Sequence, residues 1–387
     1  MIEETVRRLG DGAVITLESG EKIFQLDSFG ENPVVKPWDI GLAWHKNGKK
    51  KFGAVFNPGA VLHEDRVILA PRCHMNYEKV KFFDEKLGIE RYGFENYVSE
   101  IWLLTSKDGV KFEKLSKKIK GDGSEHKDFT YGIEDVRIVN YKEKYLLVGC
   151  GKIKPPFKGT DADRIAIYST KNFEEINYHG IISCFDGRNA VPIFLNNEVY
   201  MVLRFHPNIY LAPLKGGIDQ LLNPSDYLEE WKEIYDNKES FLLLEAGNFP
   251  HEKEKIGAGP PPIKTDEGWL LIYHAVGEIT TEICKSYGLN ISIERGYSIC
   301  AAILDPDDPR KVLCRTKKPI YIPSKPYELF GDQAYPVDVP AVVFPTGIIQ
   351  IEDKLLLYCG AGDKYVILLG CSLKNLLNYM FEHCSLT

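Results

Sequence analysis

Charged side chains stand inside a strand-like stretch at GIEDVRI, residues 132–138. Glu134 and Asp135 are adjacent there, and Arg137 follows among apolar residues. Strand interiors are poor in Asp, so a carboxylate in such a place marks a turn, a cap or a functional group. A turn residue and a working acid are both open interpretations of Asp135, and the elements that position it have to decide between them.

Five segments of the chain share one order of elements. An apolar strand, a short polar turn and a second apolar strand are followed by a third strand, and the paired strands cover residues 60–72, 136–150, 190–205, 261–274 and 341–363. Repeated antiparallel units of this kind are typical of a β-propeller, whose blades surround a central axis. We therefore predict an all-β fold, a five-bladed β-propeller that forms one catalytic domain over residues 1–387. A two-sheet sandwich is the structural alternative.

The segments outside these repeats have other expected roles. Residues 1–50 precede the first repeated segment, so we expect them to help close the ring against the last blade. Short helices are predicted at Pro224–Glu233 and at the C-terminus, residues 372–387, with Leu373–His383 as its helical part. Strands do not alternate with helices along the chain, which excludes a doubly wound α/β fold.

The predicted hairpins place particular residues at one mouth of the ring. In an antiparallel hairpin the start of the first strand and the end of the second meet at the same edge. The residues at these positions are Asn57, Arg72, Asp135, Cys150, Arg188, Asn189, Arg204, His206, Lys255, Tyr273, His274, Asp338 and Asp363. Cations, carboxylates and amides gathered in this way form a pocket for a polar, partly anionic ligand.

Composition limits the partners of the protein. The net charge is −7 and no long basic run occurs, which argues against a nucleic-acid partner. The nine cysteines include no CxxC pair, so neither a zinc site nor a disulfide framework is predicted. The N-terminus lacks the pattern of a signal peptide, and no apolar run is long enough to span a membrane. We therefore expect a cytoplasmic protein with no membrane partner, which could form a homo-oligomer.

Motif searches narrow the chemistry further. The chain contains no HExxH or GxSxG motif, so metal-dependent hydrolysis and serine nucleophiles have no support. The prolines at 260–262 exclude the helix that a phosphate-binding P-loop requires. The acidic stretch at 305–309 is interpreted as a solvated turn and not as a calcium loop, so no metal site is predicted. Carboxylate acid–base chemistry beside an anion pocket remains.

Several motifs also resemble a known family. They are NPGAV, GIEDVRI, KIGAGPPPIKTDEGWLLIYH, AAILDPDDPRKVL, VVFPTG and YCGAGD, which occur in this order between about residue 55 and about residue 365. Together they resemble glycoside hydrolase family 130, five-bladed propellers that are mostly mannoside phosphorylases. The resemblance implies a glycosyltransferase-type phosphorylase that cleaves β-mannosides with inorganic phosphate and inversion, releasing α-mannose 1-phosphate. It implies phosphate as co-substrate and no cofactor.

The resemblance also implies roles for individual residues. Asp135 matches the general acid, which acts in that family through a hydroxyl of the bound mannose. The residues that match phosphate-binding positions are Arg188, Arg204 and Lys255, with Tyr273 or His274 completing the anion site. Arg72 and Asp363 match positions that hold the sugar, and we assign Asn57, Asn189 and Asp338 to the substrate as well. We expect Asp135 to be protonated in the working complex, because a general acid must hold its proton at the operating pH. Burial beside Glu134 would raise its pKa, while Arg137 would oppose that shift.

Two other functions stay open at this point. Inverting hydrolysis would need a second carboxylate as base, about 6.5–9.5 Å from the acid, and Glu134, Asp338 and Asp363 are candidates for it. A non-catalytic sugar-binding propeller would need no acid. The linkage is open among β-1,4- and β-1,2-linked manno-oligosaccharides, mannosyl-glucose and mannosyl-N-acetylglucosamine.

Overall fold

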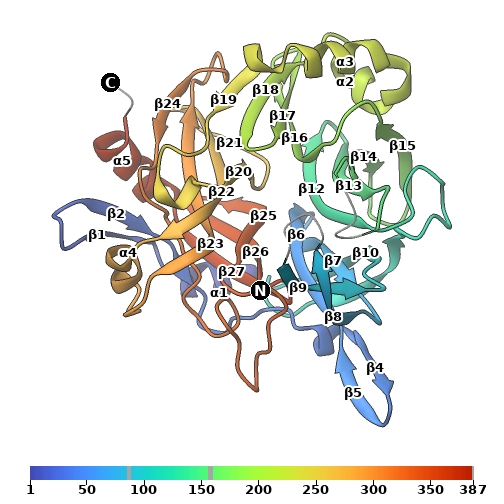
Figure 1. Cartoon of the computed structure of the whole chain (residues 1–387). Coiled ribbons are helices and arrows are strands. Elements are labelled where there is room, and N and C mark those ends of the chain that lie inside the picture. Colours follow the sequence, from blue (N-terminus) through green and yellow to red (C-terminus); the bar gives the residue numbers. More distant parts are fainter. Residues whose placement is uncertain (85–88, 156–159, 386–387) are drawn as a thin grey trace.

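The computed structural model describes residues 1–84, 89–155 and 160–385. Five antiparallel sheets surround a central axis, which confirms the predicted five-bladed β-propeller (Figure 1). The first strand of each blade lies nearest the axis, next to the first strands of other blades. Within the described residues, no helix is long and apolar enough to cross a membrane.

The first three blades follow each other along the chain. Blade one consists of β6 (Ala54–His63), β7 (Arg66–His74), β10 (Ser99–Ser106) and β11 (Glu113–Ile119). Blade two consists of β12 (Ile133–Tyr141), β13 (Lys144–Lys152), β14 (Asp163–Thr170) and β15 (Ile176–Ile182). Blade three consists of β16 (Arg188–Leu195), β17 (Glu198–Phe205), β18 (Asn208–Pro213) and β19 (Leu242–Leu244).

The ring is completed by two further blades. Blade four consists of β20 (Lys255–Ala258), β22 (Trp269–Ile279), β23 (Ile293–Leu304) and β24 (Val312–Arg315), with β21 (Ile263–Lys264) paired to β22. Blade five consists of β25 (Val343–Ile351), β26 (Lys354–Ala361), β27 (Tyr365–Ser372) and β3 (Asp27–Ser28). Because β3 pairs with β27, the N-terminal segment supplies the outer strand of the last blade.

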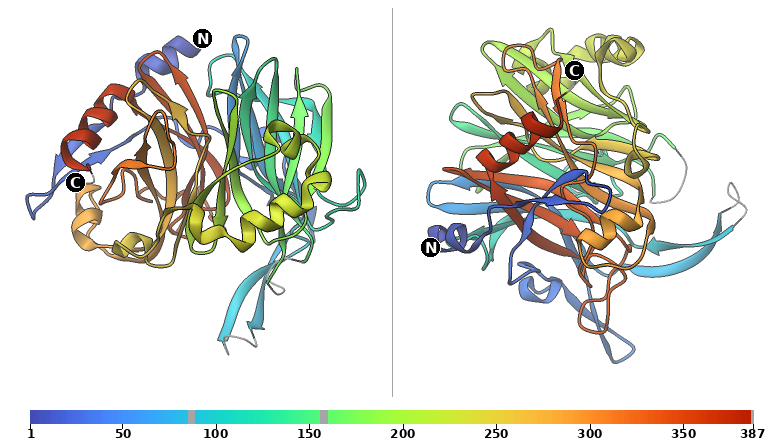
Figure 2. Two further views of the ribbon diagram at one scale, coloured as in Figure 1. Left: turned by 90° about the horizontal axis from the view of Figure 1, so that it is seen from above. Right: turned by 90° about the vertical axis from the view of Figure 1, so that its left-hand side faces the viewer.

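Among the described residues, three two-stranded hairpins lie outside the blades. They are β1 (Ala13–Thr16) with β2 (Lys22–Gln25), β4 (Ala43–Lys46) with β5 (Lys49–Phe52), and β8 (Glu78–Asp84) with β9 (Ile89–Glu95). The last of these extends from blade one away from the ring (Figure 2). Its base continues into Tyr97, which reaches the central cavity.

Helices cover the outer edges of the propeller. The predicted helix near Pro224 is present as η2 (Pro224–Tyr227) and α3 (Leu228–Asp236), and the predicted C-terminal helix is α5 (Leu373–His383). The hydroxyl of Ser372 accepts a hydrogen bond from the Asn375 backbone and so caps α5. The remaining helices are α1 (Ile2–Arg8), α2 (Gly217–Leu222), α4 (Thr281–Ser286), η1 (Pro37–Ile40), η3 (Lys238–Phe241) and η4 (Pro250–Glu252).

Apolar side chains fill the space between neighbouring blades. Between blades one and two, for example, Val61 and Ile68 pack with Val136 and Leu147. Both faces of most strands are therefore buried, which is why the strands are nearly continuous apolar runs in the sequence.

A bulge near the start of the inner strand recurs in the first three blades. The strand register shifts there in β6, β12 and β16. Asn57, Asp135 and Asn189 occupy these bulges with left-handed φ angles of 47°, 51° and 55°. Asn and Asp adopt this conformation more readily than most residues, and a bulge redirects its side chain. Side chains that regular pleating would place between the sheets point into the central cavity instead.

Candidate active site

A cavity of about 380 Å³ opens at one mouth of the ring. Its walls contain six basic side chains and three carboxylates, contributed by all five blades. The charged residues are Arg72, Lys152, Arg188, Arg204, Lys255, Arg295, Glu134, Asp135 and Asp363. The other lining residues are Asn57, Phe94, Tyr97, Asn189, His274, Tyr297, Val339, Val342 and Phe344. A polar cavity with an excess of positive charge suits a polar ligand together with an anion.

The structure brings most of the predicted site residues to this cavity. Of the thirteen positions read from the strand ends, all except Cys150, His206, Tyr273 and Asp338 line it. Lys152, Arg295 and Tyr297 are lining residues that the sequence prediction missed. The signal for Arg295 and Tyr297 was available, because the third strand of a blade begins at the edge where the second strand ends.

Asp135 lies at the centre of a network of cationic and amide donors. Its carboxylate accepts a hydrogen bond from Asn57 Nδ2 at 2.9 Å and from Arg188 Nη2 at 3.1 Å, and Arg72 Nη1 is 3.6 Å away. Burial favours the neutral acid, but Arg72, Arg188 and Arg137 together outweigh it and lower the pKa of Asp135 to about 2. This low pKa describes the free protein, whereas the predicted protonation of Asp135 concerns the working complex and stays a prediction.

Glu134 is occupied by two arginines. Its Oε1 lies 2.8 Å from Arg72 Nη2, and its Oε2 lies 3.0 Å from Arg188 Nη2. Asp163, which does not line the cavity, lies 3.4 Å from Arg188 Nη1 and also pairs with Lys152. Because both oxygens of Glu134 are engaged in ion pairs, its role is to fix the arginines on either side of Asp135.

The basic half of the cavity holds positive charge that the protein does not match. Arg204 makes no ion pair within the described part of the chain, and its buried Nε has no hydrogen-bond partner there. Burial, followed by repulsion from Arg188, lowers the pKa of Arg204 to about 10. Lys255 lines the same cavity, with its Nζ 5.5 Å above the ring of Tyr297, and within the described residues its ion pair is with the partly exposed Glu254, at 3.4 Å. A buried cation of this kind is stabilised by a bound anion.

His274 and Asn189 reach this half of the cavity because of one glycine. A side-chain carbon on Gly257 would lie 2.4 Å from His274 Cε1 and 2.8 Å from Asn189 Nδ2. Burial, followed by repulsion from Arg204, lowers the pKa of His274 well below its ordinary value. His274 is therefore neutral and can donate a hydrogen bond to an anion without adding charge.

Comparison with known proteins agrees with this geometry. A glycoside hydrolase family 130 model, described as beta-1,4-mannooligosaccharide phosphorylase, matches residues 21–382. The chain belongs to glycoside hydrolase family 130. The resemblance noted in the sequence motifs is thereby confirmed, and the members described below are mannoside phosphorylases.

Two relatives with assigned activities match most of the chain, and a third matches about a third of it. The 1,2-beta-oligomannan phosphorylase of Thermoanaerobacter sp. (strain X514) is 29% identical over 321 residues, which are 78% of this chain and 93% of that protein. The beta-1,2-mannobiose phosphorylase of Listeria innocua is 28% identical over 385 residues, a match that covers 89% of this chain and 95% of that protein. The beta-1,4-mannooligosaccharide phosphorylase of Ruminococcus albus is 35% identical over 136 residues, 35% of each chain.

Solved family 130 structures share the fold. The beta-1,2-mannobiose phosphorylase from Listeria innocua, in complex with beta-1,2-mannobiose, superposes with a TM-score of 0.65 at 22% identity. The match covers 92% of this chain and 99% of that one.

Tyr273, predicted to complete the anion site of this family 130 protein, lies outside the cavity lining. Neighbouring residues of a strand point to opposite faces, so Tyr273 points away from the cavity that His274 lines. Its hydroxyl donates to Glu252 Oε1 at 2.8 Å and accepts from Arg315 Nε at 3.2 Å. Arg315 also donates to Glu252 Oε2 at 2.7 Å, which completes a buried polar cluster inside blade four.

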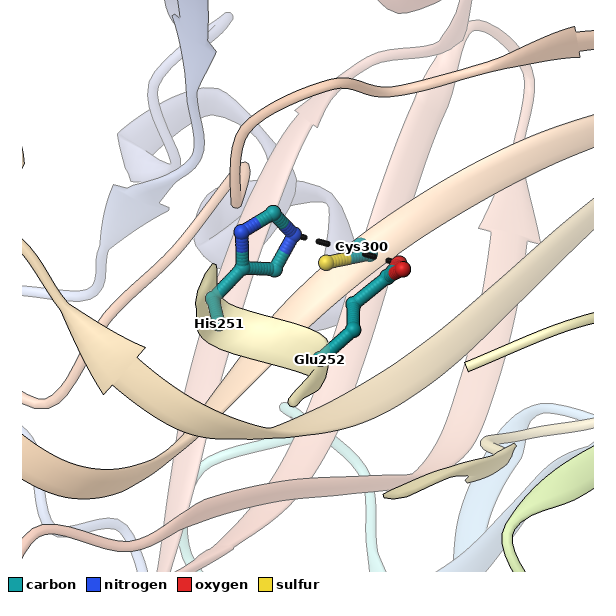
Figure 3. Close-up of side chains that lie close together, drawn as sticks. All are labelled: His251, Glu252 and Cys300. Carbon is teal, nitrogen blue, oxygen red and sulfur yellow. Dashed lines mark ion pairs between the residues drawn. The ribbon is translucent and has the colours of Figure 1, made fainter. Parts of the chain in front are cut away.

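Two further polar side chains adjoin this cluster. His251, Glu252 and Cys300 converge so that one ligand atom of each lies within 4.8 Å of the others (Figure 3). Both oxygens of Glu252 are already bonded to Tyr273 and Arg315. Burial, with repulsion from Lys318 and Arg315, lowers the pKa of His251 to about 3. The same positive charges disfavour an additional cation, so we interpret the cluster as a structural element of blade four.

Tyr273→Phe tests this assignment. The substitution removes one hydroxyl from a buried cluster, and we expect a loss of about 1–3 kcal/mol in the free energy of unfolding measured with urea. The KM for phosphate should stay within about twofold of wild type, because the ring lies outside the cavity. A rise in that KM of tenfold or more would return Tyr273 to the anion site.

Asp338, predicted to bind substrate, lies outside the cavity lining. It accepts a hydrogen bond from the Tyr77 hydroxyl and lies 3.4 Å from Lys364 Nζ. These contacts join the loop before blade five to blade one and to the turn between β26 and β27. Because Lys364 directly follows Asp363, the paired Asp338 positions the turn that carries a cavity carboxyl.

Asp363 also lines the cavity, but its surroundings raise its pKa, whereas those of Asp135 lower it. It has a left-handed φ of 50° at the turn after β26. Burial, reinforced by Asp135, Asp338 and Glu134 and opposed by Arg72, raises its pKa to about 7. Carboxyls whose pKa values are driven apart in one cavity take different roles in acid–base chemistry.

The raised pKa predicts how stability depends on pH. Between the unfolded value of about 4 and the folded value of about 7, folded Asp363 holds a proton that the unfolded chain has released. Its contribution to stability is complete below this interval and is lost as pH rises through it. Asp363→Asn cannot titrate, so the free energy of unfolding of the variant relative to wild type should increase by roughly 1–3 kcal/mol from pH 4.5 to pH 8. Urea unfolding at both pH values measures the difference, and a constant difference would refute the shift.

Proposed function

We propose that the protein is an inverting β-mannoside phosphorylase that uses inorganic phosphate as co-substrate and requires no cofactor. The observation that carries the proposal is the unmatched positive charge of Arg204, beside Lys255 and a neutral His274, in the same cavity as Asp135. Attack by a phosphate dianion on an anomeric carbon needs several charge-assisted hydrogen bonds to position the nucleophile. Departure of the sugar oxygen needs one proton donor, and Asp135 serves this purpose.

The proton balance explains how an ionised Asp135 acts as an acid. Phosphorolysis converts a mannoside and HPO₄²⁻ into mannose 1-phosphate dianion and a free alcohol, so the proton gained by the leaving oxygen is supplied overall by phosphate. A bound phosphate neutralises part of the charge of Arg188 and Arg204, which raises the pKa of Asp135. Asp135 then takes up the proton and delivers it, through a hydroxyl of the bound sugar, to the leaving oxygen.

Inverting hydrolysis is the second candidate, and Asp363 favours it. This carboxyl lines the cavity and makes no hydrogen bond or ion pair to a side chain in the described part of the chain. With a pKa of about 7 it could activate water as a general base. Glu134 is unsuited to that task because both of its oxygens are paired with arginines.

The substrate we propose is a β-1,2-linked mannoside. Relatives that match 78% and 89% of the chain are phosphorylases of β-1,2-linked mannosides. The relative described as acting on β-1,4-linked mannooligosaccharides matches 35% of it.

Initial rates on a panel of disaccharides test the proposal. The panel contains β-1,2-mannobiose, β-1,4-mannobiose, mannosyl-glucose and mannosyl-N-acetylglucosamine, each assayed with and without phosphate. We expect β-1,2-mannobiose to be cleaved fastest and only in the presence of phosphate. Equal rates without phosphate would establish hydrolysis, and sugar binding without turnover would indicate a non-catalytic propeller.

A further inference from the structure

Arg137 is a fully buried arginine beneath the cavity, with an exposed fraction of 1%. Its guanidinium makes no ion pair with a carboxylate in the described residues and donates to three backbone carbonyls instead. Nη1 donates to Asp135 O at 2.7 Å, Nη2 to Ala258 O at 2.9 Å and Nε to Gly259 O at 3.0 Å. Arg137 thus links the inner strand of blade two to that of blade four across the axis.

The partners of Arg137 belong to the two halves of the proposed site. Asp135 is the acid, and Ala258 ends β20, the strand that begins with Lys255. A side-chain carbon on Gly259 would lie 2.7 Å from Ile272 O and 3.2 Å from Pro345 O, so glycine is needed for the chain to pass this close to the backbones of blades four and five. On blade five, the ring of Phe344 lies 5.8 Å from the guanidinium and also lines the cavity.

This arrangement is costly for the fold. Burial lowers the pKa of Arg137 to about 10, since no carboxylate side chain is bonded to the guanidinium. Asp135 is held at a φ of 51°, a left-handed conformation that is unfavourable for a residue with a Cβ. Strain of this kind persists when the surroundings fix it, and it clusters at functional sites. Arg137 lies two residues after Asp135 in β12 and donates a hydrogen bond to the backbone carbonyl of this strained residue.

We propose that Arg137 is a positioning residue, which holds the bulge at Asp135 and keeps the acid in register with the anion half of the cavity. The inference rests on the proposed function of Asp135 as the acid. Arg137 does not line the cavity and so contacts neither sugar nor phosphate. It acts through the backbone of Asp135 and through the carbonyls of Ala258 and Gly259.

The test compares two substitutions with a matched control. Arg137→Met retains the length of the side chain but removes its charge and donors, and Arg137→Lys retains the charge but cannot reach three carbonyls. Arg315→Met removes another buried arginine, with an exposed fraction of 7%, that also makes several hydrogen bonds but lies outside the cavity. Each variant is assayed for kcat and KM on an ordinary mannoside and on a nitrophenyl mannoside, per folded molecule determined by circular dichroism.

The expected pattern separates positioning from stability. Arg137→Met should lose about 10- to 100-fold in kcat on the ordinary mannoside, since a displaced catalytic group costs factors of this size. The loss should be smaller on the nitrophenyl mannoside, whose leaving group needs little protonation. Arg137→Lys should lie between Met and wild type, and KM for phosphate should change less than about threefold in both. Arg315→Met should lower the melting temperature but leave kcat per folded molecule unchanged.

Two results would overturn the inference. One is an equal loss of kcat on both substrates in the Arg137 variants. The other is a crystal structure of Arg137→Met, or of Arg137→Lys if Met does not fold, in which residue 135 keeps its left-handed φ and its contacts to Asn57 and Arg188. The crystal structure needs no turnover, so it tests Arg137 even if wild type fails to cleave mannosides. A wild-type protein without activity would instead refute the proposed function.

Discussion

Replacing Asp135 by Asn should leave a folded protein that binds sugar but has lost about 10²- to 10⁴-fold in kcat on an ordinary β-mannoside. Asn keeps the shape of the side chain and can bond to Arg188 through its oxygen, but it cannot take up and release a proton. The lost factor is the usual contribution of a positioned general acid. Steady-state rates at saturating phosphate measure it.

The leaving group distinguishes acid catalysis from a general disturbance of the site. On a nitrophenyl mannoside, the variant should recover much of its rate, because this leaving group departs with little proton assistance. Asp163→Asn is the matched control, since Asp163 also pairs with Arg188 but does not line the cavity. Its effect should be similar on both substrates. If Asp135→Asn keeps more than about a tenth of wild-type kcat on the ordinary mannoside, Asp135 is a turn residue and not the acid.

Arg204→Ala should raise the KM for phosphate by about 10- to 150-fold, with a further loss of turnover. A charged hydrogen bond contributes roughly 1.5–3 kcal/mol, and Arg204 has no protein anion that would compensate for its loss within the described structure. The KM for the mannoside should change much less. Rates measured over a range of phosphate concentrations at a saturating mannoside concentration give both constants.

Arg295→Ala provides the control at the same cavity. Its guanidinium is half exposed and already bonded to both oxygens of Glu254, at 2.6 and 2.8 Å. It therefore has less charge available for an anion, and its removal should raise the KM for phosphate by less than about fivefold. Equal effects of the two substitutions would show that Arg204 has no special part in binding phosphate.

The blades could be predicted from the sequence because each is a local pattern. Apolar strands and polar turns follow one another within a few tens of residues, and their order repeats. The outer strand of blade five could not be predicted in the same way. β3 has only two residues, and its partner β27 begins at Tyr365, more than three hundred residues later.

The sequence predicts which residues stand at the ends of strands, and the candidate site could be predicted only to that extent. The choice between Tyr273 and His274 depends on which face of β22 meets the cavity, and both faces are buried, so the sequence carries no alternation to decide it. The charge state of Asp135 depends on Arg72 from blade one and Arg188 from blade three, which only the closed ring brings together. The contacts of Arg137 to blade four have the same origin.

The central claim is that phosphate, and not water, attacks the anomeric carbon in this cavity. Nuclear magnetic resonance of the first product formed from β-1,2-mannobiose in phosphate buffer tests it most directly. If phosphate is the nucleophile, α-mannose 1-phosphate and free mannose form in equal amounts from the first time point, and no reaction occurs when phosphate is omitted. Free mannose as the only product, formed at the same rate without phosphate, would contradict it.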